Sequence, residues 1–363
     1  MNRRLPLTPV TTSRPAIGTH LSGYTTLRLG GPAARFIEAT SAREVVDAVC
    51  AADAAGEPLL VLGGGSNVLV ADKGFDGTVV HIASKGVGMD STSGSVQLTA
   101  EAGESWDSVV EQTVRAGLGG IECLSGIPGL VGATPVQNVG AYGVEVSEVL
   151  VSVDLLDRAS GEVRTLTADQ LGLAYRTSVL KGTDRAVVLR VRFQLADSGL
   201  SAPIRYAELA NTLGVAPGER VPVAHVRQSV LDLRRGKGMV LDPDDHDTWS
   251  AGSFFTNPVL PEPHLTEALA RIRAQVGPDV RIPQYPGGKL SAAWLIERAG
   301  FPKGHPGPGN RVALSHSHTL ALTNRGDGTT DDLLSLAREV RDGVDQVFGV
   351  ELAAEPVLVG CSM

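Results

Sequence analysis

Leu-Ser-Gly-Ile-Pro-Gly-Leu-Val-Gly-Ala-Thr-Pro-Val-Gln-Asn-Val-Gly-Ala-Tyr, residues 124–142, is the most informative stretch of this chain. It is apolar and uncharged, and its glycines and prolines exclude a regular helix or a central strand. Such a run is either a buried loop or a loop that wraps a ligand. The backbone polar groups of a buried loop need partners, and a bound polar ligand would supply them.

A second glycine-rich run, Gly63-Gly64-Gly65-Ser66-Asn67, follows residues 59–62, which have the pattern of a short apolar strand. Loops of this kind often hold phosphates through backbone N–H groups. The run is not a P-loop, because no Gly-Lys-Ser/Thr follows it, and Val68 breaks the dinucleotide fingerprint. A plain glycine turn and a phosphate loop both remain open.

Strand and helix patterns alternate along the chain, which indicates a mixed α and β protein. Ser41 and Glu44 form a capping-box pattern at the start of a helix, and Gly56 marks its end. Residues 1–20 are expected to form an irregular arm. Periodicity predicts further helices at 106–116, 221–235, 262–276, 290–299 and 330–348, and strands at 59–62, 78–82, 96–100, 149–156, 163–166, 186–195 and 357–359.

Length and composition indicate a globular protein of two or three domains. Of the 363 residues, 42% are hydrophobic and 20% are charged, which excludes a disordered chain. The net charge of −8 argues against a nucleic-acid partner. Cys50, Cys123 and Cys361 form neither a disulfide framework nor a metal-ligand spacing, which is typical of a reducing cytosol.

The sequence predicts neither a metal site nor a membrane segment. His316 and His318 alternate on one expected strand face, but no third ligand is spaced to complete a metal site. The acidic run 242–247 lacks the glycine and the distal glutamate of a calcium loop. No stretch reaches 18 apolar residues, and the N-terminus has no apolar signal core, so we expect a cytoplasmic protein.

Three further motifs carry reactive side chains that also have ordinary structural explanations. Arg176 follows Tyr175, and it is either a surface arginine or a guanidinium that binds a carboxylate or an enolate. Ser253 lies in a turn-like Gly-Ser-Phe-Phe motif without the Gly-x-Ser-x-Gly elbow of a hydrolase nucleophile. Glu355, in an apolar terminal stretch, is either an exposed edge residue or a buried carboxylate that needs a partner.

Taken in order, these motifs resemble the UDP-N-acetylenolpyruvoylglucosamine reductase family over about residues 20–360. They are Gly63-Gly-Gly-Ser-Asn67, Ile127-Pro-Gly129 through Gly140-Ala-Tyr-Gly143, Tyr175-Arg176-x-Ser178, Gly252-Ser-Phe-Phe-x-Asn-Pro258 and Glu355. The resemblance implies an α+β chain with an FAD-binding fold of the vanillyl-alcohol-oxidase (PCMH) type and a C-terminal α+β substrate-binding domain. The implied FAD-binding domain spans 20–197, in two α/β subdomains near 20–90 and 91–197 joined by the terminal strand 354–363, and the substrate-binding domain spans 198–353.

The same resemblance implies a flavin-dependent oxidoreductase of peptidoglycan precursor synthesis, and hence a role in cell-wall biogenesis, cell shape and cell division. Its expected reaction is the reduction of UDP-N-acetylglucosamine enolpyruvate to UDP-N-acetylmuramate, with non-covalent FAD as cofactor and NADPH as reductant. The implied partner is the UDP-sugar substrate, and we expect a monomer that binds neither nucleic acid nor membrane.

The resemblance also assigns roles to individual residues. Arg176 and Glu355 would stabilise an enolate, Glu355 only when protonated, and Ser253 would donate the proton that quenches it. FAD would be bound by Gly63, Gly64, Gly65, Ser66, Asn67, Ser125, Gly126, Ile127, Pro128, Gly129, Gly132, Ala133, Gln137, Asn138, Gly140 and Ala141. The substrate would be bound by Tyr142, Tyr175, Tyr206, Lys237, Asn257 and Lys289, with Tyr206 as the closing residue of the subtype that has a tyrosine loop.

Two features depart from the family pattern, and two other functions remain as alternatives. The loop 238–250 is longer than in relatives, and His318 stands where some relatives carry Gln. One alternative is an alcohol or sugar oxidase of the same fold, which would often tether its flavin through His or Cys. The other is a non-catalytic regulator that binds nucleotide sugars, against which the retained Arg176, Ser253 and Glu355 argue.

Overall fold

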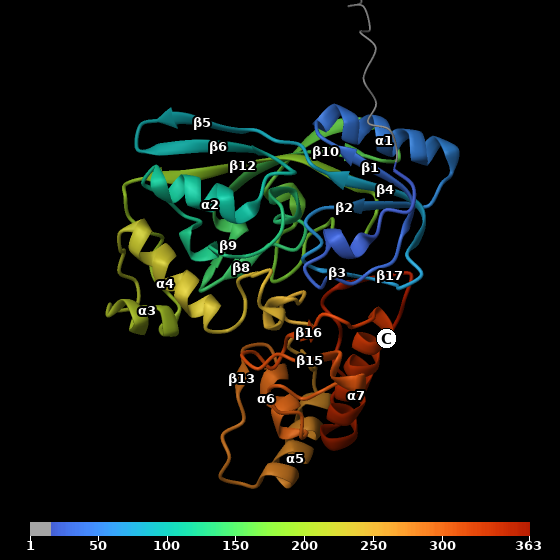
Figure 1. Ribbon diagram of the computed structural model, residues 1–363. Helices are drawn as coiled ribbons and strands as arrows, with labels where there is room; N and C mark the ends of the chain where they lie inside the picture. The colour runs from blue at the N-terminus through green and yellow to red at the C-terminus, as the bar shows by residue number, and fades with distance from the viewer. Residues whose placement is uncertain (1–15) are drawn as a thin grey trace, which may run out of the picture.

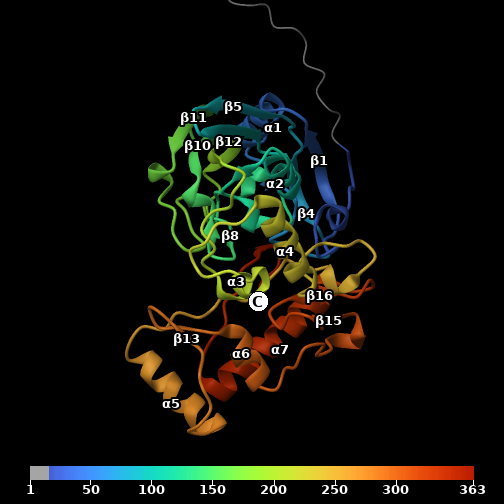
Figure 2. The same ribbon diagram turned by 90° about the vertical axis from the view of Figure 1, so that its left-hand side faces the viewer.

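The computed structural model describes residues 16–363, so most of the expected N-terminal arm lies outside the described residues. Figures 1 and 2 show a large body with most of the strands and a smaller, mainly helical body beneath it, built from later residues. The chain returns to the large body at its C-terminal end. The expected mixture of helices and strands is confirmed.

The N-terminal part of the large body is a small parallel sheet of strand order β1-β4-β2, with β1 at Ala33–Ala39, β4 at Phe75–Ile82 and β2 at Leu59–Leu62. Helix α1 (Ala42–Ala55) packs on it and buries Val45 and Val49. The side chain of Ser41 accepts a hydrogen bond from Glu44 N, and Gly56 ends the helix in the left-handed conformation. Both predicted ends of this helix are confirmed.

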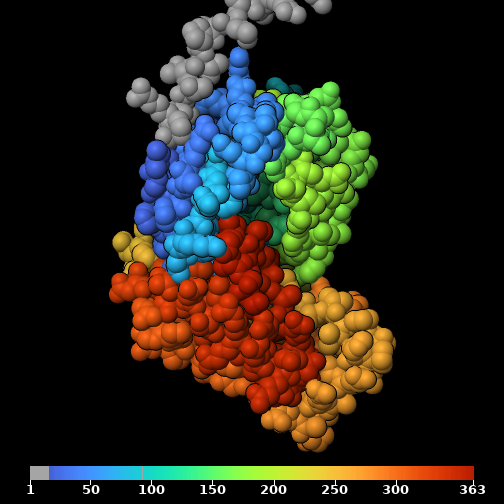
Figure 3. Space-filling model, turned by 90° about the vertical axis from the view of Figure 1, so that its right-hand side faces the viewer, coloured from blue at the N-terminus to red at the C-terminus, as the bar shows by residue number. Residues whose placement is uncertain are grey.

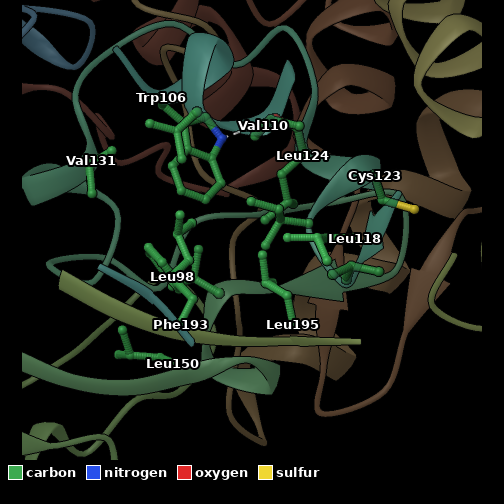
Figure 4. Packing of buried hydrophobic residues seen from close by; sticks show 14 of the residues in the cluster. Leu98, Trp106, Val110, Leu118, Cys123, Leu124, Val131, Leu150, Phe193 and Leu195 are labelled. Carbon is green, nitrogen blue, oxygen red and sulfur yellow. Dashed lines mark hydrogen bonds between the residues drawn. The ribbon is translucent and has the colours of Figure 1, made fainter. Parts of the chain in front are cut away.

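The second sheet of the large body is antiparallel, with strand order β11-β10-β12-β6-β5. Helix α2 (Trp106–Arg115) covers it, and Trp106 packs against Phe193 in the core that Figure 4 shows. The strands of this sheet are β5 Val87–Thr92, β6 Ser95–Glu101, β10 Leu150–Asp157, β11 Glu162–Thr167 and β12 Ala186–Asp197. The short strand β7 (Leu118–Gly119) pairs with β12.

Two helices beyond residue 197 belong to this same core. Helix α3 (Ala207–Leu213) contributes Leu209, and helix α4 (Val223–Arg235) contributes Val226 and Val230. Hydrophobic packing therefore changes from one body to the other after α4, whereas the resemblance implies a domain start at residue 198.

The smaller body has its own core around the long helix α7 (Thr330–Phe348). Phe254 and Phe255 are buried in that core and hold the loop that contains Ser253. Its other elements are α5 His264–Val276, α6 Ala292–Arg298 and the hairpins β13 Gln284–Tyr285 with β14 Lys289–Leu290 and β15 Val312–Leu314 with β16 Leu322–Asn324.

The two bodies meet through the end of the chain. Strand β17 (Val357–Val359) pairs in parallel with β3 (Val68–Val70), directly after the glycine run 63–67. This pairing confirms the expected terminal strand. The short pair β8 (Gly140–Ala141) and β9 (Val144–Glu145) closes the stretch 124–142, which otherwise consists of turns and 3₁₀ segments, as its composition predicts. Among residues 16–363, no helix combines the length and the apolar character that crossing a bilayer requires.

Trp106 links the core to the loop that follows it. The side chain is fully buried, its Nε1–H donates to the Leu124 carbonyl oxygen, and its backbone N–H donates to the carbonyl oxygen of Gly129. We predict that Trp106→Ala lowers the free energy of unfolding by about 3–5 kcal/mol, because a large cavity and an unpaired carbonyl result. Urea denaturation followed by circular dichroism measures this change.

The matched control is Val163→Ala on the edge strand β11, where the side chain is 55% exposed. It should change the free energy of unfolding by less than about 0.5 kcal/mol. Equal effects of the two substitutions would contradict the role of Trp106 in this core.

Candidate active site

A cavity of about 450 Å³ lies where the glycine loops, the turn around Arg176 and the terminal segment meet. Its wall includes Arg176, Ser253 and Glu355, which lie far apart in the sequence. In Figure 3, a hollow separates the blue-to-cyan N-terminal segment from the green segment, with the red terminal segment below it.

Two glycine loops form one wall of the cavity by direct backbone contact. A Cβ atom added to Gly64 would lie 2.8 Å from Gly129 Cα, and one added to Gly129 would lie 2.6 Å from Ser66 Oγ. Gly129 also has a φ of +117°, which disfavours other residues. Only glycine lets the loop 63–67 and the loop 124–142 approach this closely.

Asn67 joins three parts of the cavity wall. Its Nδ2 donates to Gln137 Oε1 at 3.1 Å and to the Glu355 carbonyl oxygen at 3.5 Å. Its own carbonyl oxygen accepts a hydrogen bond from Val357 N–H. The glycine loop is therefore fixed to both the loop 124–142 and the terminal segment.

Arg176 and Glu355 face each other across the cavity wall, with Arg176 Nε 4.0 Å from Glu355 Oε1. Arg176 has a φ of +53°, a strained conformation for a non-glycine residue, and its Nη2 donates to the Gly140 carbonyl oxygen. Ser178 Oγ donates to the Val136 carbonyl oxygen, which ties this turn to the loop 124–142. The turn thus holds the guanidinium at the cavity in spite of the strain.

Burial favours the neutral form of the Glu355 carboxyl group. Its side chain is only 15% exposed, and desolvation raises the pKa of its carboxyl group, against the opposing positive charges of Arg176 and Lys181. Of the two explanations open from the sequence, the structure shows the second in outline: the Glu355 side chain is largely shielded from solvent and has Arg176 as its partner. A carboxyl group with a raised pKa can remain protonated and donate a hydrogen bond.

Ser253 reaches the same cavity from the smaller body. Its loop is held by Phe254, whose N–H donates to the Leu320 carbonyl oxygen and whose carbonyl oxygen accepts a hydrogen bond from Glu355 N–H. The hydroxyl oxygen of Ser253 lies 3.4 Å from His318 Nε2. Backbone pairing therefore places the hydroxyl of Ser253 beside the Glu355 segment.

The expected substrate-binding residues lie outside the wall of this cavity, in separate groups. Tyr142 and Tyr206 form an edge-to-face pair with ring centroids 5.5 Å apart, and Lys237 Nζ lies 5.9 Å from the Tyr142 ring. Lys237 also forms an ion pair of 2.6 Å with Glu208. Burial is the main cause that raises the pKa of Tyr142 to about 12, so this phenol stays protonated at neutral pH.

Of the other expected substrate-binding residues, Lys289 and Tyr175 connect the two bodies, and Asn257 lies within the smaller body. Lys289 Nζ, from β14 of the smaller body, lies 3.8 Å from the ring centroid of Tyr175 of the large body. Asn257 Oδ1 accepts a hydrogen bond from Ala292 N–H, which attaches the loop after Ser253 to the start of α6.

Four of the sixteen expected cofactor-binding residues do not line the cavity. They are Ser125, Gly126, Gly132 and Asn138. Ser125 and Asn138 are fully buried and hydrogen-bonded within the protein, and a Cβ at Gly132 would collide with Ala102. The structure gives these residues a part in shaping the loop. The other twelve are in the wall: Gly63, Gly64, Gly65, Ser66, Asn67, Ile127, Pro128, Gly129, Ala133, Gln137, Gly140 and Ala141.

Arg234, which the sequence analysis did not assign to the site, also lines this cavity. Its Nη2 donates to the carbonyl oxygens of Gly126 and Met239, but its Nε is buried without a partner among the described residues. Desolvation lowers the pKa of this guanidinium, although Tyr142 and Asp107 oppose the effect. In the sequence, its only signal is the basic end of an amphipathic helix, which usually indicates a solvated face.

Comparisons with known proteins agree over nearly the whole chain. A family model for the UDP-N-acetylenolpyruvoylglucosamine reductase C-terminal domain matches residues 242–359, and one for an FAD binding domain matches residues 33–167. The UDP-N-acetylenolpyruvoylglucosamine reductase of Saccharopolyspora erythraea is 70% identical over 354 residues, which cover 96% of this chain and 97% of the relative. The reductase of Mycolicibacterium smegmatis is 53% identical over 348 residues, with 94% of each chain covered.

Among solved structures, the chain is similar to the UDP-N-acetylenolpyruvylglucosamine reductase of Thermus caldophilus. The TM-score is 0.64 at 25% sequence identity, with 95% of this chain and 99% of the other covered. Together with the FAD-binding match, this similarity confirms the predicted α+β class and the FAD-binding fold of the vanillyl-alcohol-oxidase type.

The cavity fits FAD on its own chemistry. The glycine wall leaves space that a side chain would fill at Gly64 or Gly129, and the unpartnered Nε of Arg234 provides a buried cationic donor for a diphosphate. Among the described residues of the cavity wall there is neither a histidine nor a cysteine, which suits non-covalent binding.

We predict that Gly64→Ala weakens FAD binding by about 5- to 150-fold, because the new Cβ forces the two glycine loops apart and overpacking costs about 1–3 kcal/mol. Titration of the apoprotein with FAD, followed by flavin fluorescence, measures the dissociation constant. Gly23→Ala is the matched control, since a Cβ there meets no atom within 4 Å. Unchanged FAD affinity in Gly64→Ala would show that the close contact between Gly64 and Gly129 is not needed to form the FAD-binding wall.

Proposed function

The chain belongs to the UDP-N-acetylenolpyruvoylglucosamine reductase family, and on this premise we propose that Arg176, Ser253 and Glu355 are its catalytic residues. The enzyme is an FAD-dependent oxidoreductase that uses NADPH to reduce UDP-N-acetylglucosamine enolpyruvate in peptidoglycan precursor synthesis. The observation that carries our assignment is the presence of all three side chains in the wall of the cavity that fits FAD.

FAD, when bound, supplies the hydride that adds to the enolpyruvyl double bond. Hydride addition leaves negative charge on the carbon that bears the carboxylate, and this charge is delocalised as an enolate. Arg176 offers a fixed positive charge for it, and Glu355, whose pKa is raised by burial, offers a hydrogen bond in its protonated form. Ser253 then donates its hydroxyl proton to that carbon, which completes the reduction.

The substrate-binding assignments remain proposals with geometric support. Tyr142, Tyr206 and Lys237 combine aromatic surface with a cation, which suits a nucleoside diphosphate. Tyr175 and Lys289 are in contact across the two bodies, which places them where a ligand bound between the bodies would touch both. Asn257 supports the loop that carries Ser253.

We further propose a cytoplasmic monomer whose substrate-binding domain begins after α4. The free thiols of Cys50, Cys123 and Cys361 support a reducing compartment. The packing of α3 and α4 in the large core supports the later domain boundary. Analytical ultracentrifugation of the holoenzyme tests the monomeric state.

Ser253→Ala should leave reduction of the holoenzyme by NADPH unchanged and slow its reoxidation by the enolpyruvyl substrate by about 10²- to 10⁴-fold, because the proton donor is lost. Anaerobic stopped-flow absorbance separates the two half-reactions. Thr256→Ala in the same loop, outside the cavity wall, should affect neither. Equal loss of both half-reactions in Ser253→Ala would rule out the proton-donor role.

The pH dependence tests Glu355. Because burial raises the pKa of its carboxyl group, the protonated form should persist above the usual range of glutamate. Reoxidation by the substrate should slow as the pH rises through this raised pKa, since the ionised group cannot donate a hydrogen bond.

Glu355→Gln keeps a donor at every pH, so it should abolish this decline and retain more activity than Glu355→Ala. The exposed Glu351 supplies the control variant Glu351→Gln, which should keep the wild-type pH profile. A decline that persists in Glu355→Gln would assign the titration to another group.

A further inference from the structure

Ser253 has one side-chain partner among the described residues, and that partner is His318. The distance from Ser253 Oγ to His318 Nε2 is 3.4 Å, and catalytic hydrogen bonds are often this long before the substrate binds. His318 lies in the turn between β15 and β16. The Leu320 carbonyl oxygen of that turn accepts the Phe254 N–H, so backbone pairing fixes the two side chains relative to each other.

The turn that carries His318 is itself rigid. Ser315 Oγ accepts the backbone N–H groups of Ser317 and His318 and donates to Asp247 Oδ2. Asp247 in turn accepts the His316 N–H and forms an ion pair of 2.9 Å with Arg325. Two carboxylates contact this turn, and both are occupied: Asp247 by these partners and Glu297 by the hydroxyl of Thr319.

The groups facing His318 keep its imidazole neutral. Desolvation by burial, followed by the positive charges of Lys237, Lys303 and Arg234, lowers the pKa of His318 to about 4. These cations come from the end of α4, the segment after it and the segment after α6. A neutral imidazole has one N–H and one lone pair, so the tautomer decides what Ser253 can do.

We propose that His318 is the positioning residue of Ser253, with its Nε2–H donating to Ser253 Oγ. This inference rests on the proposed role of Ser253 as proton donor. With Nε2–H donating, the serine hydroxyl hydrogen is free to point at the substrate carbon. With the opposite tautomer, the serine would instead donate its hydrogen to Nε2, and the proton would be held away from the substrate.

The proton transfer balances with water as the one further reactant. The O–H bond of Ser253 breaks, a C–H bond forms on the substrate carbon, and the electron pair of the O–H bond stays on Oγ. His318 Nε2–H stabilises this developing alkoxide by a hydrogen bond. Water then returns a proton to Oγ, and His318 remains neutral throughout.

The first test measures the tautomer without turnover. The FAD-loaded enzyme, labelled with ¹⁵N-histidine, is compared with His318→Gln to assign the His318 signals. We expect a neutral imidazole with Nε2 protonated and Nδ1 bare between about pH 8 and pH 5.5, well above the pKa of about 4. A Nδ1–H tautomer or an imidazolium at pH 7 would overturn the proposal.

The second test measures the half-reactions of the holoenzyme with NADPH and UDP-N-acetylglucosamine enolpyruvate. His318→Leu should slow reoxidation by about 10- to 100-fold, the effect expected when a hydrogen bond to a charged group is lost. Its reduction by NADPH and its dissociation constant for the substrate should stay within about threefold of wild type, since the lost contact acts on Ser253 alone. His318→Gln, whose amide keeps an N–H donor, should restore most of the rate.

His316→Leu is the matched control, because His316 is exposed in the same turn, and it should match wild type. In the double variant Ser253→Ala/His318→Leu, the second substitution should add no further loss. Additive losses, or full activity in His318→Leu, would refute the role of His318 while leaving that of Ser253 intact. Normal reoxidation of Ser253→Ala would instead refute the proton-donor role of Ser253. This result is distinct from a failure of the positioning role of His318 alone.

Discussion

Two backbone hydrogen bonds of the terminal segment hold the active site together. Glu355 N–H donates to the Phe254 carbonyl oxygen at 2.8 Å, and Val357 N–H donates to the Asn67 carbonyl oxygen at 3.0 Å. The first bond fixes the segment to the loop of Ser253 in the smaller body, and the second fixes it to the glycine loop of the large body. The positions of Ser253 and Glu355, which we propose as catalytic residues, therefore depend on the return of the chain to β3 of the large body.

This junction explains the chemistry of the site as well as its shape. Because the terminal segment runs between the two bodies, the Glu355 side chain is shielded from solvent and its carboxyl group has a raised pKa. Arg176 supplies the opposing charge from a strained turn that three side-chain contacts support. The surroundings thus differ for each group: Arg176 is a fixed cation, burial favours the neutral form of the Glu355 carboxyl group, and Ser253 offers a hydroxyl.

Local sequence signals predicted much of the fold. The capped helix α1, the strand β2 and the helix α7 were predictable because cap residues and hydrophobic periodicity act within a few residues. Strand β1 was not predicted, because its burial does not alternate regularly. Helix α3 was not predicted either, because Tyr206 stands at its N-cap and supplies no side-chain capping signal, whereas Ser291 caps the equally short α6. Residues 197–203 have the composition of a linker, yet the helices after them pack in the first core, which only long-range packing determines.

The candidate site likewise contains residues that the sequence indicates and residues that only long-range packing brings to it. Ordered motifs were sufficient to name Arg176, Ser253 and Glu355, which the structure brings to one cavity. Arg234 was missed, because the burial of a basic helix end depends on a loop about a hundred residues earlier. The contact between Ser253 and His318 was equally invisible, since it joins residues 65 positions apart through a turn.

The most direct test of this account is the visible spectrum of the wild-type holoenzyme through one anaerobic cycle. NADPH is added first, and one equivalent of UDP-N-acetylglucosamine enolpyruvate follows. The account predicts that NADPH bleaches the yellow protein and that the enolpyruvyl substrate restores the colour completely. A protein that bleaches but stays colourless with this substrate would contradict the assignment of the cavity to enolpyruvyl reduction.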